Sequence, residues 1–335
     1  MEKVKVYLPD SLIRLIDADC EAFDIHKPDG KINRNRFLNE LLQHYFYSYR
    51  DKRQAQLAAL QAVLHDAAPL PASVELDAAA RCLAVVSQSC ADCDDPARGI
   101  SLKPTRRTEP IIQYVTSDSL GGASISSYLR DMLNSYASFP QSEREKIMFS
   151  NEYETIQGAI RKNRMISFAT RRTPNIVHHV NVYAVATSKE RLFNYVLCEE
   201  EGRISSYRLS RINLPVTMPE ARTFSPSDEE KFLRMLTYGP AFAINTLEDI
   251  RVRFTDAGLR KYQAIYLNRP DPAEVGDHEM VFQCARDQIV RYLERLGADA
   301  VIVSPQDVRD EAATYYKAAA DAYAEGAETA EAMDD

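Results

Sequence analysis

Alternating apolar and polar residues open the chain and then give way to helical spacing. Residues 4–8 (VKVYL) place three apolar side chains on one side and Lys5 and Tyr7 on the other, which predicts a half-buried strand. Pro9 and the residues after it start a helix, and a turn around Gly30 leads to a second one. The apolar residues of the second helix are spaced three and four apart: Phe37, Leu38, Leu41, Leu42, Tyr45, Phe46 and Tyr49. The predicted order is strand, helix, helix.

The same order returns later in the chain. A shift of 91 positions places Gly30, Leu38, Leu42 and Tyr45 on Gly121, Leu129, Leu133 and Tyr136. Before this second helix, residues 100–103 predict another strand and residues 106–116 another helix. We therefore predict two copies of one unit, at about residues 1–53 and 98–150, joined by a linker at 54–97 that combines a helix rich in alanine, leucine and glutamine with loops.

One such unit leaves its strand unpaired and part of its apolar surface exposed, so it needs a partner. Two copies in one chain can complete each other. The arrangement resembles the ribbon-helix-helix fold, a dimer whose two strands pair antiparallel and present outward side chains to the DNA major groove. The resemblance implies nucleic-acid contacts from the outward residues of both strands, which are Lys3, Lys5, Tyr7, Ser101 and Lys103.

The two predicted strands differ in sequence. A pair of them lacks the full twofold symmetry that matches a palindromic operator, which disfavours sequence-specific repression. In the alternative interpretation, the repeat is a helical scaffold with no binding role.

Residues 151–222 change to a pattern of short strands. After one helix, alternation predicts strands at 165–169, 178–186, 192–198 and 204–209. Short strands separated by turns are typical of a small barrel.

Residues 203–212 (RISSYRLSRI) resemble the closing strand of the WYL domain, an Sm-like or SH3-like barrel of bacterial regulators. The triplet that names the family falls on Asn194, Tyr195 and Val196, so only Tyr195 matches the family pattern. The resemblance implies a ligand groove in which Arg208 and Arg211 are the groove arginines.

A groove of this kind suits single-stranded nucleic acid or a nucleotide, because aromatic rings stack on bases and arginine forks bind phosphates. The candidate groove residues are His179, Tyr183, Lys189, Arg191, Asn194, Tyr195, Arg208 and Arg211. For the tyrosines, the alternative is a place in the core. For Arg208 and Arg211, it is surface ion pairing.

Strands and helices alternate again from residue 223, which predicts a small α/β sandwich of ferredoxin-like type at 223–325. Residues 326–335 are small and acidic and predict a disordered tail. The module resembles the C-terminal extension that follows WYL domains, and this resemblance implies a homodimer contact. The tyrosines of its last helix fit either an interface or a core: Tyr315, Tyr316 and Tyr323.

The net charge of −8 disfavours a polyanionic partner at first. By region, basic and acidic residues number 18 and 20 in 1–150, 11 and 7 in 151–222, and 12 and 22 in 223–335. The middle of the chain is therefore basic. Residues 161–172 hold five cations and no carboxylate, a local field that attracts phosphates, with a solvated helix end as the alternative.

The sequence gives little support for an enzyme, since it has no nucleotide-binding loop, metalloprotease motif or nucleophile motif. His178 and His179 are adjacent on a predicted strand and point to opposite faces, which disfavours joint acid–base catalysis. Cys82, Cys90 and Cys93 fall short of a four-ligand zinc site, so we expect no metal and no cofactor. Without a spanning apolar run or a signal core, we expect a cytoplasmic protein that does not enter a membrane.

The predicted modules together form a multidomain α+β protein and cover nearly the whole chain. Their succession resembles the WYL-containing accessory proteins of type VI-D CRISPR systems, on residues 126–149, on the RLSRI segment and on the GADAVIVSPQDV segment. The resemblance implies a homodimer that binds single-stranded RNA and raises the activity of the RNA-guided RNase, the type VI effector. The alternative is a transcriptional regulator whose ribbon binds duplex DNA and whose WYL domain senses a nucleotide or single-stranded nucleic acid.

Overall fold

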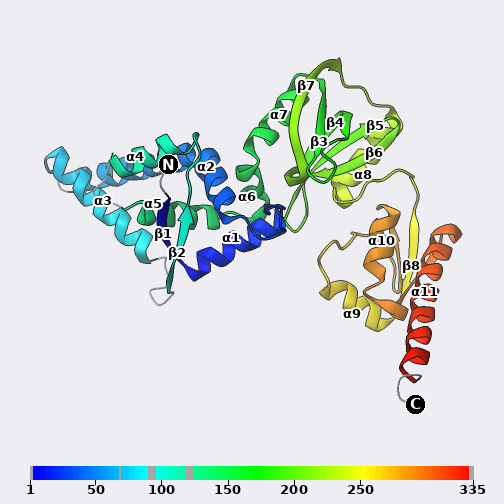
Figure 1. The fold of residues 1–335 in the computed structure, drawn as a ribbon. Helices are drawn as coiled ribbons and strands as arrows, with labels where there is room; N and C mark the ends of the chain where they lie inside the picture. Colours follow the sequence, from blue (N-terminus) through cyan, green and yellow to red (C-terminus); the bar gives the residue numbers. More distant parts are fainter. Residues whose placement is uncertain (1–2, 68, 90–95, 118–123, 332–335) are drawn as a thin grey trace. The chain divides into compact units, whose positions relative to one another are not determined.

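The computed structural model describes residues 3–67, 69–89, 96–117 and 124–331 of the chain (Figure 1). The chain divides into two compact units, Met1–Tyr153 and Glu154–Asp335. Both units combine helices with antiparallel sheets. No helix in the described ranges combines the length and the apolar character that a membrane span needs.

The first unit is built around a two-stranded antiparallel ribbon. Strand β1 (Val4–Pro9) pairs with β2 (Ala97–Leu102), and the register sets Val4 opposite Leu102. Helices α1 (Asp10–Ala22) and α5 (Ile125–Ala137) contact β1, and α2 (Arg34–Ala67) contacts β2 (Figure 1). The other helices of the first unit are α3 (Ala72–Ser89), α4 (Glu109–Ser117), α6 (Gln141–Met148) and the start of α7 (Ser150–Arg161).

The apolar residues matched by the 91-residue shift form one core. Both members of each matched pair are buried: Leu38 and Leu129, Leu41 and Met132, Leu42 and Leu133, Tyr45 and Tyr136. The rings of Tyr45 and Tyr136 lie 6.3 Å apart between centroids, so the two copies meet through equivalent residues. Gly30 has a φ of +80°, as its predicted turn requires, while Gly121 lies outside the described residues.

The segment predicted as a linker is largely helical. Helix α2 continues without a break to Ala67, because this stretch is rich in alanine, leucine and glutamine and contains no glycine or proline. Helix α3 folds back along α2 and covers its apolar stripe, which joins Leu57, Leu60, Leu64, Ala79 and Leu83 in a small cluster. The side chains of His65 and Glu75 meet at 2.7 Å near the turn between the two helices.

The second unit begins with a five-stranded antiparallel sheet. Its strands are β3 (Arg164–Thr170), β4 (Val177–Thr187), β5 (Asn194–Glu200), β6 (Arg203–Arg208) and β7 (Ile212–Ala221), in the order β6-β5-β4-β3-β7. Over the described ranges, β6 and β7 are the edges of this sheet, so the strands do not close into the expected barrel. Strand β7 was not anticipated because it contains Pro215 and Pro219, which an edge strand tolerates.

Helix α8 (Pro226–Tyr238) packs on one face of this sheet. A capping box between Ser225 and Asp228 starts the helix. Phe232 and Met235 of α8 are buried with Leu197 of β5 and Ile204 of β6. Tyr183 of β4 and Tyr195 of β5 are both partly buried against this cluster.

The rest of the second unit contains a four-stranded antiparallel sheet. The elements follow as β8 (Ile250–Phe254), α9 (Asp256–Ala264), β9 (Glu274–Val275), β10 (Glu279–Phe282), α10 (Arg286–Leu293), β11 (Ala300–Ser304) and α11 (Gln306–Glu331). The strand order β11-β8-β10-β9 is the split βαβ topology. Helix α11 runs to Glu331, so the acidic segment predicted to be disordered from residue 326 is helical as far as that residue.

A buried ion pair fastens α1 to α6. Asp19 is 1% exposed and accepts hydrogen bonds from Arg144 Nε at 2.9 Å and Nη2 at 2.8 Å. The hydroxyl of Tyr136 donates a third hydrogen bond to Asp19 at 2.8 Å. Both oxygens of the buried Asp19 carboxylate therefore accept hydrogen bonds from α5 and α6, which are distant from α1 in the sequence.

We expect Asp19→Ala to lower the free energy of unfolding by about 3–5 kcal/mol, because it leaves the guanidinium of Arg144 buried without its counter-charge. Urea denaturation followed by circular dichroism measures the change. Asp17→Ala on the same helix is the control: Asp17 pairs with Arg34 near the surface, and its loss should cost about 0–1 kcal/mol. Equal losses in the two variants would contradict the prediction.

Candidate nucleic-acid interface

The outer side of the β1–β2 ribbon carries all five residues predicted there. Val6, Leu8 and Leu102 point inward and are fully buried. The alternation predicted for the ribbon is confirmed by the exposed residues on its other side: Lys3, Lys5, Tyr7, Ser101 and Lys103. The structure brings these side chains together because β1 and β2 are in register, with Lys5 opposite Ser101.

Gly99 shapes this outer side and was not singled out from the sequence. It lies opposite Tyr7 in the register. A Cβ atom at Gly99 would lie 2.7 Å from Cε of Lys5 and 3.3 Å from the Tyr7 ring. The missing side chain therefore gives room for Lys5 to lie beside Tyr7, with Nζ 5.2 Å from the ring centroid.

An open groove of about 700 Å³ adjoins the ribbon. It runs between β2, at Gly99–Ser101, and the segment that leads into α2. Lys27, Lys31 and Arg34 line it. Arg34 also binds Asp17 through two hydrogen bonds of 2.6 and 2.7 Å, and this bonding raises the pKa of the Arg34 guanidinium. Glu21 also lines the groove, and Lys31 pairs with Asp29 at 3.6 Å, so carboxylates offset part of the positive charge beside the start of α2.

In the second unit, Tyr195 and Arg208 are direct neighbours across β5 and β6. The guanidinium carbon of Arg208 lies 3.4 Å from the ring centroid of Phe193, so the arginine stacks on that ring. Phe193 was missed from the sequence because an apolar residue before a strand carries no chemical signature.

Arg211 lies in the short 3₁₀ turn Leu209–Arg211 that follows Arg208. The turn accepts two hydrogen bonds of 2.8 Å from Arg171 at the end of β3, one from the backbone N–H to the Arg211 carbonyl and one from Nε to the Ser210 carbonyl. The structure therefore gathers Arg171, Arg208 and Arg211 around one turn. We call these three residues the arginine turn.

Tyr183 is partly buried and packs against the core cluster under α8. Its ring stacks on Phe232 of α8 with centroids 4.4 Å apart and an interplanar angle of 8°, and it meets Phe224 edge-on at 5.3 Å. One ring face is thus committed to packing. Of the two interpretations of the tyrosines, binding or packing against the core, the structure therefore agrees with packing for Tyr183.

The remaining candidate groove residues are not gathered around the arginine turn. Asn194 is fully buried and accepts a hydrogen bond of 2.9 Å from the hydroxyl of Thr187. Lys189 pairs with Asp271. Arg191 is exposed in the loop between β4 and β5, with a φ of +56°. His179 is exposed on β4, where Nδ1 lies 3.4 Å from Sδ of Met218.

The two adjacent histidines point to opposite faces of β4, as alternation predicts. His178 lies inward, with Nδ1 3.0 Å from Oε2 of Glu200 and its ring 5.3 Å from that of Tyr207. Burial and the charge of Glu200 raise the pKa of Tyr207 to about 12. His178 and His179 therefore share no common site.

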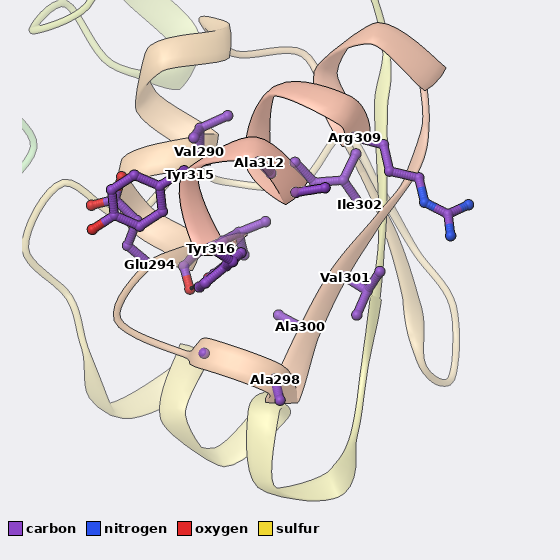
Figure 2. A pocket seen from close by; sticks show the side chains of 13 residues that line it. Val290, Glu294, Ala298, Ala300, Val301, Ile302, Arg309, Ala312, Tyr315 and Tyr316 are labelled. Atoms are coloured by element: carbon purple, nitrogen blue, oxygen red, sulfur yellow. Dashed lines mark hydrogen bonds between the residues drawn. The ribbon is translucent and has the colours of Figure 1, made fainter. Parts of the chain in front are cut away.

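An apolar groove of about 450 Å³ lies in the C-terminal part of the second unit, between α10, β11 and α11 (Figure 2). Small residues leave it open: Gly297, Ala298, Ala300, Ala312 and Ala313. Tyr315 and Tyr316 project from α11 along it, and the Tyr316 hydroxyl donates to the Leu293 carbonyl at 3.2 Å (Figure 2). Tyr315 and Tyr316, for which the sequence allows either an interface or a core position, thus lie at the surface of a groove.

Comparison with solved structures shows a shared fold. A protein described as a CRISPR Cas-related protein is 18% identical, with a TM-score of 0.66 over 97% of this chain and 95% of that chain. The proteasome accessory factor B/C of Arthrobacter aurescens is 14% identical, with a TM-score of 0.24 over 68% of this chain and 38% of that one. No protein-family model and no curated protein matches the chain. The first likeness extends over both units.

We expect Tyr183→Ala to lower the free energy of unfolding by roughly 3 kcal/mol, because it removes a ring stacked on Phe232 and leaves a cavity under α8. Arg191→Ala, at an exposed loop position, should change it by less than about 0.5 kcal/mol. Thermal and urea unfolding of both variants measure the difference. An unchanged stability of the Tyr183 variant would refute the core role of this ring.

Proposed function

We propose that the protein is a non-enzymatic accessory factor of CRISPR systems that binds single-stranded RNA and raises the activity of an RNA-guided RNase. The observation that carries the proposal is the arginine turn, where Arg171 binds the carbonyls of Ser210 and Arg211, and Arg208 lies opposite Tyr195 with its guanidinium stacked on Phe193. Arginine forks bind phosphate, and nearby rings offer faces to bases. The fold shared with a CRISPR Cas-related protein supports the CRISPR context.

The proposal interprets the first unit as a fused pair of ribbon-helix-helix motifs and the five-stranded sheet as an open WYL-type sheet of the Sm-like class. The antiparallel β1–β2 pairing and the matched buried residues of the two copies support the first interpretation. The RLSRI segment at the arginine turn supports the second. The C-terminal split βαβ sheet corresponds to the ferredoxin-like extension.

A second candidate function is that of a transcriptional regulator that binds duplex DNA. The specific observation in its favour is the outer side of the ribbon, where Lys5, Tyr7 and Lys103 are exposed beside the groove lined by Lys27 and Lys31. A two-stranded ribbon fits the major groove, and flanking lysines bind its phosphates. In this case the arginine turn would sense a nucleotide or a single strand.

The proposal includes a homodimer formed through the C-terminal part. Strand β11 is an edge of its sheet, and Val301 on it is 50% exposed beside the apolar groove of α11 (Figure 2). An edge strand next to an apolar groove can pair with its counterpart in a second copy and bury the groove at the same time.

We expect the double variant Arg208→Ala/Arg211→Ala to weaken single-stranded RNA binding by roughly tenfold or more. It should also reduce the slope of log affinity against log salt by about 1.4, because two phosphate contacts are lost at about 0.7 each on single strands. Fluorescence polarisation with single-stranded RNA, single-stranded DNA and duplex DNA across a salt series measures both quantities.

Two further variants keep this test informative. Arg291→Ala removes an exposed arginine of α10 that pairs with Asp287 and should leave the affinity and the slope unchanged. Preference for duplex DNA that is lost in Lys5→Ala/Tyr7→Ala would favour the regulator instead. Unchanged RNA binding in the double arginine variant would overturn the site.

We expect Val301→Asp to convert the dimer to a monomer at micromolar concentration, because it places a carboxylate at the proposed strand pairing. Sedimentation velocity measures the mass. Val275→Asp is the matched control, because Val275 is 69% exposed on β9, the opposite edge of the same sheet. A Val301→Asp protein that remains dimeric, or a wild-type protein that is monomeric, would refute this contact.

A further inference from the structure

The outer face of β3, β4 and β7 exposes aliphatic side chains that the fold does not bury. Ile176 is 54% exposed, Val177 and Val216 are each 58% exposed, and Leu214 is 77% exposed. We call these four residues the aliphatic face. They belong to the second unit and lie outside the residues used in the proposed RNA site.

The strand register places Val177 and Val216 on the same side of the sheet, while Ile176 directly precedes β4 and Leu214 lies at the bulge between Asn213 and Val216. Val177 lies opposite Ala169, which lies opposite Asn213, and the next row joins His179, Ser167 and Val216. Residues directly opposite in a ladder point to the same side of the sheet. Because adjacent strands are about 4.8 Å apart, the two outer strands of this face lie about 10 Å apart, within reach of one partner segment.

Leu214 is held in a conformation that leucine rarely adopts. Its φ is +48°, in the left-handed region, at the bulge where β7 shifts register against β3. Branched and bulky side chains are unfavourable in this region, and glycine or asparagine is the usual occupant. The sequence therefore keeps a strained, exposed leucine where a polar residue would be easier to accommodate, and strain of this kind concentrates at binding sites.

The charges around the aliphatic face select the class of partner. The sequence has no carboxylate between Glu154 and Glu190, or between Glu201 and Glu220, which includes all of β3, all of β4 and β7 as far as Pro219. Arg164 begins β3, and Arg171 and Arg172 follow its end. A second copy would bring like charges together. Aliphatic side chains also lack the flat π-faces on which nucleic-acid bases stack.

We propose that the aliphatic face docks a protein surface with an apolar centre and carboxylates around it. This partner is identified, on the basis of the proposed function, as the RNA-guided RNase that the chain stimulates. Leu214, the most exposed of the four residues, is the anchor of the contact, and Arg164 at the start of β3 pairs with the partner's carboxylates.

The test uses Leu214→Asn in the full-length chain. Asparagine accepts the left-handed conformation and removes the apolar anchor, so the midpoint of thermal unfolding should stay the same or rise. Biolayer interferometry against the purified, guide-loaded RNase of the source genome measures docking, and cleavage of a reporter RNA measures stimulation. We expect docking to weaken roughly tenfold or more and stimulation to fall with it, while affinity for single-stranded RNA is unchanged.

Two variants accompany this measurement. Val177→Thr keeps the β-branched shape of the side chain and should weaken docking in the same direction. Leu233→Gln is the matched control, because Leu233 is 56% exposed on α8, outside the aliphatic face, and its loss should leave docking unchanged.

The outcomes separate this inference from the proposed function. If the wild-type chain neither docks on nor stimulates the RNase, the proposed function fails. If the wild type docks and Leu214→Asn docks equally well, only the aliphatic face is refuted. A Leu214→Asn protein with weakened RNA affinity, or with a smaller sedimenting mass, would assign the face to RNA or to a second copy and would also overturn the proposal.

Discussion

Pairing of β1 with β2 is the constraint on which the first unit depends. Each strand alone would expose its backbone N–H and C=O groups along both edges, so the start of the chain has to meet Ala97–Leu102. The pairing sets α1 and α2 against α4 and α5 around a core that includes Tyr45 and Tyr136. Because both strands belong to one chain, the two halves can diverge, and Tyr7 accordingly faces Gly99 instead of a second tyrosine.

The spacing of apolar residues along the chain predicts those parts of the fold in which each helix or strand buries one side. It places Val6 and Leu8 inward and Lys5 outward, and it finds most helices and strands of both units. It does not predict that α2 continues to Ala67, because α3 supports the second half of that helix through tertiary packing. Strand β7 is missed for a different reason. Its prolines argue against a strand until the sheet order shows that β7 is an edge.

The candidate site is less predictable than the fold, because sheet register and packing decide which residues meet. The sequence singles out Arg208 and Tyr195 by their chemistry, and the β5–β6 register makes them neighbours. Tyr183 has the same chemistry as Tyr195, and both pack against the cluster under α8, where the Tyr183 ring stacks on Phe232. Phe193 belongs to the candidate site only because the guanidinium of Arg208 stacks on its ring. A sequence pattern does not contain these relations.

The distribution of charge explains how a chain of net charge −8 can offer a surface to anions. At physiological ionic strength, charges act over about 8 Å, so the acidic helix α11 does not cancel cations that lie farther away than this. Strand β3 has 7 residues and is therefore about 20 Å long. Arg164 at its start and Arg171 at its end consequently act as separate centres. Phosphates at the arginine turn and carboxylates near Arg164 would then be bound independently, and a bound RNA would leave part of the basic surface open to a protein partner.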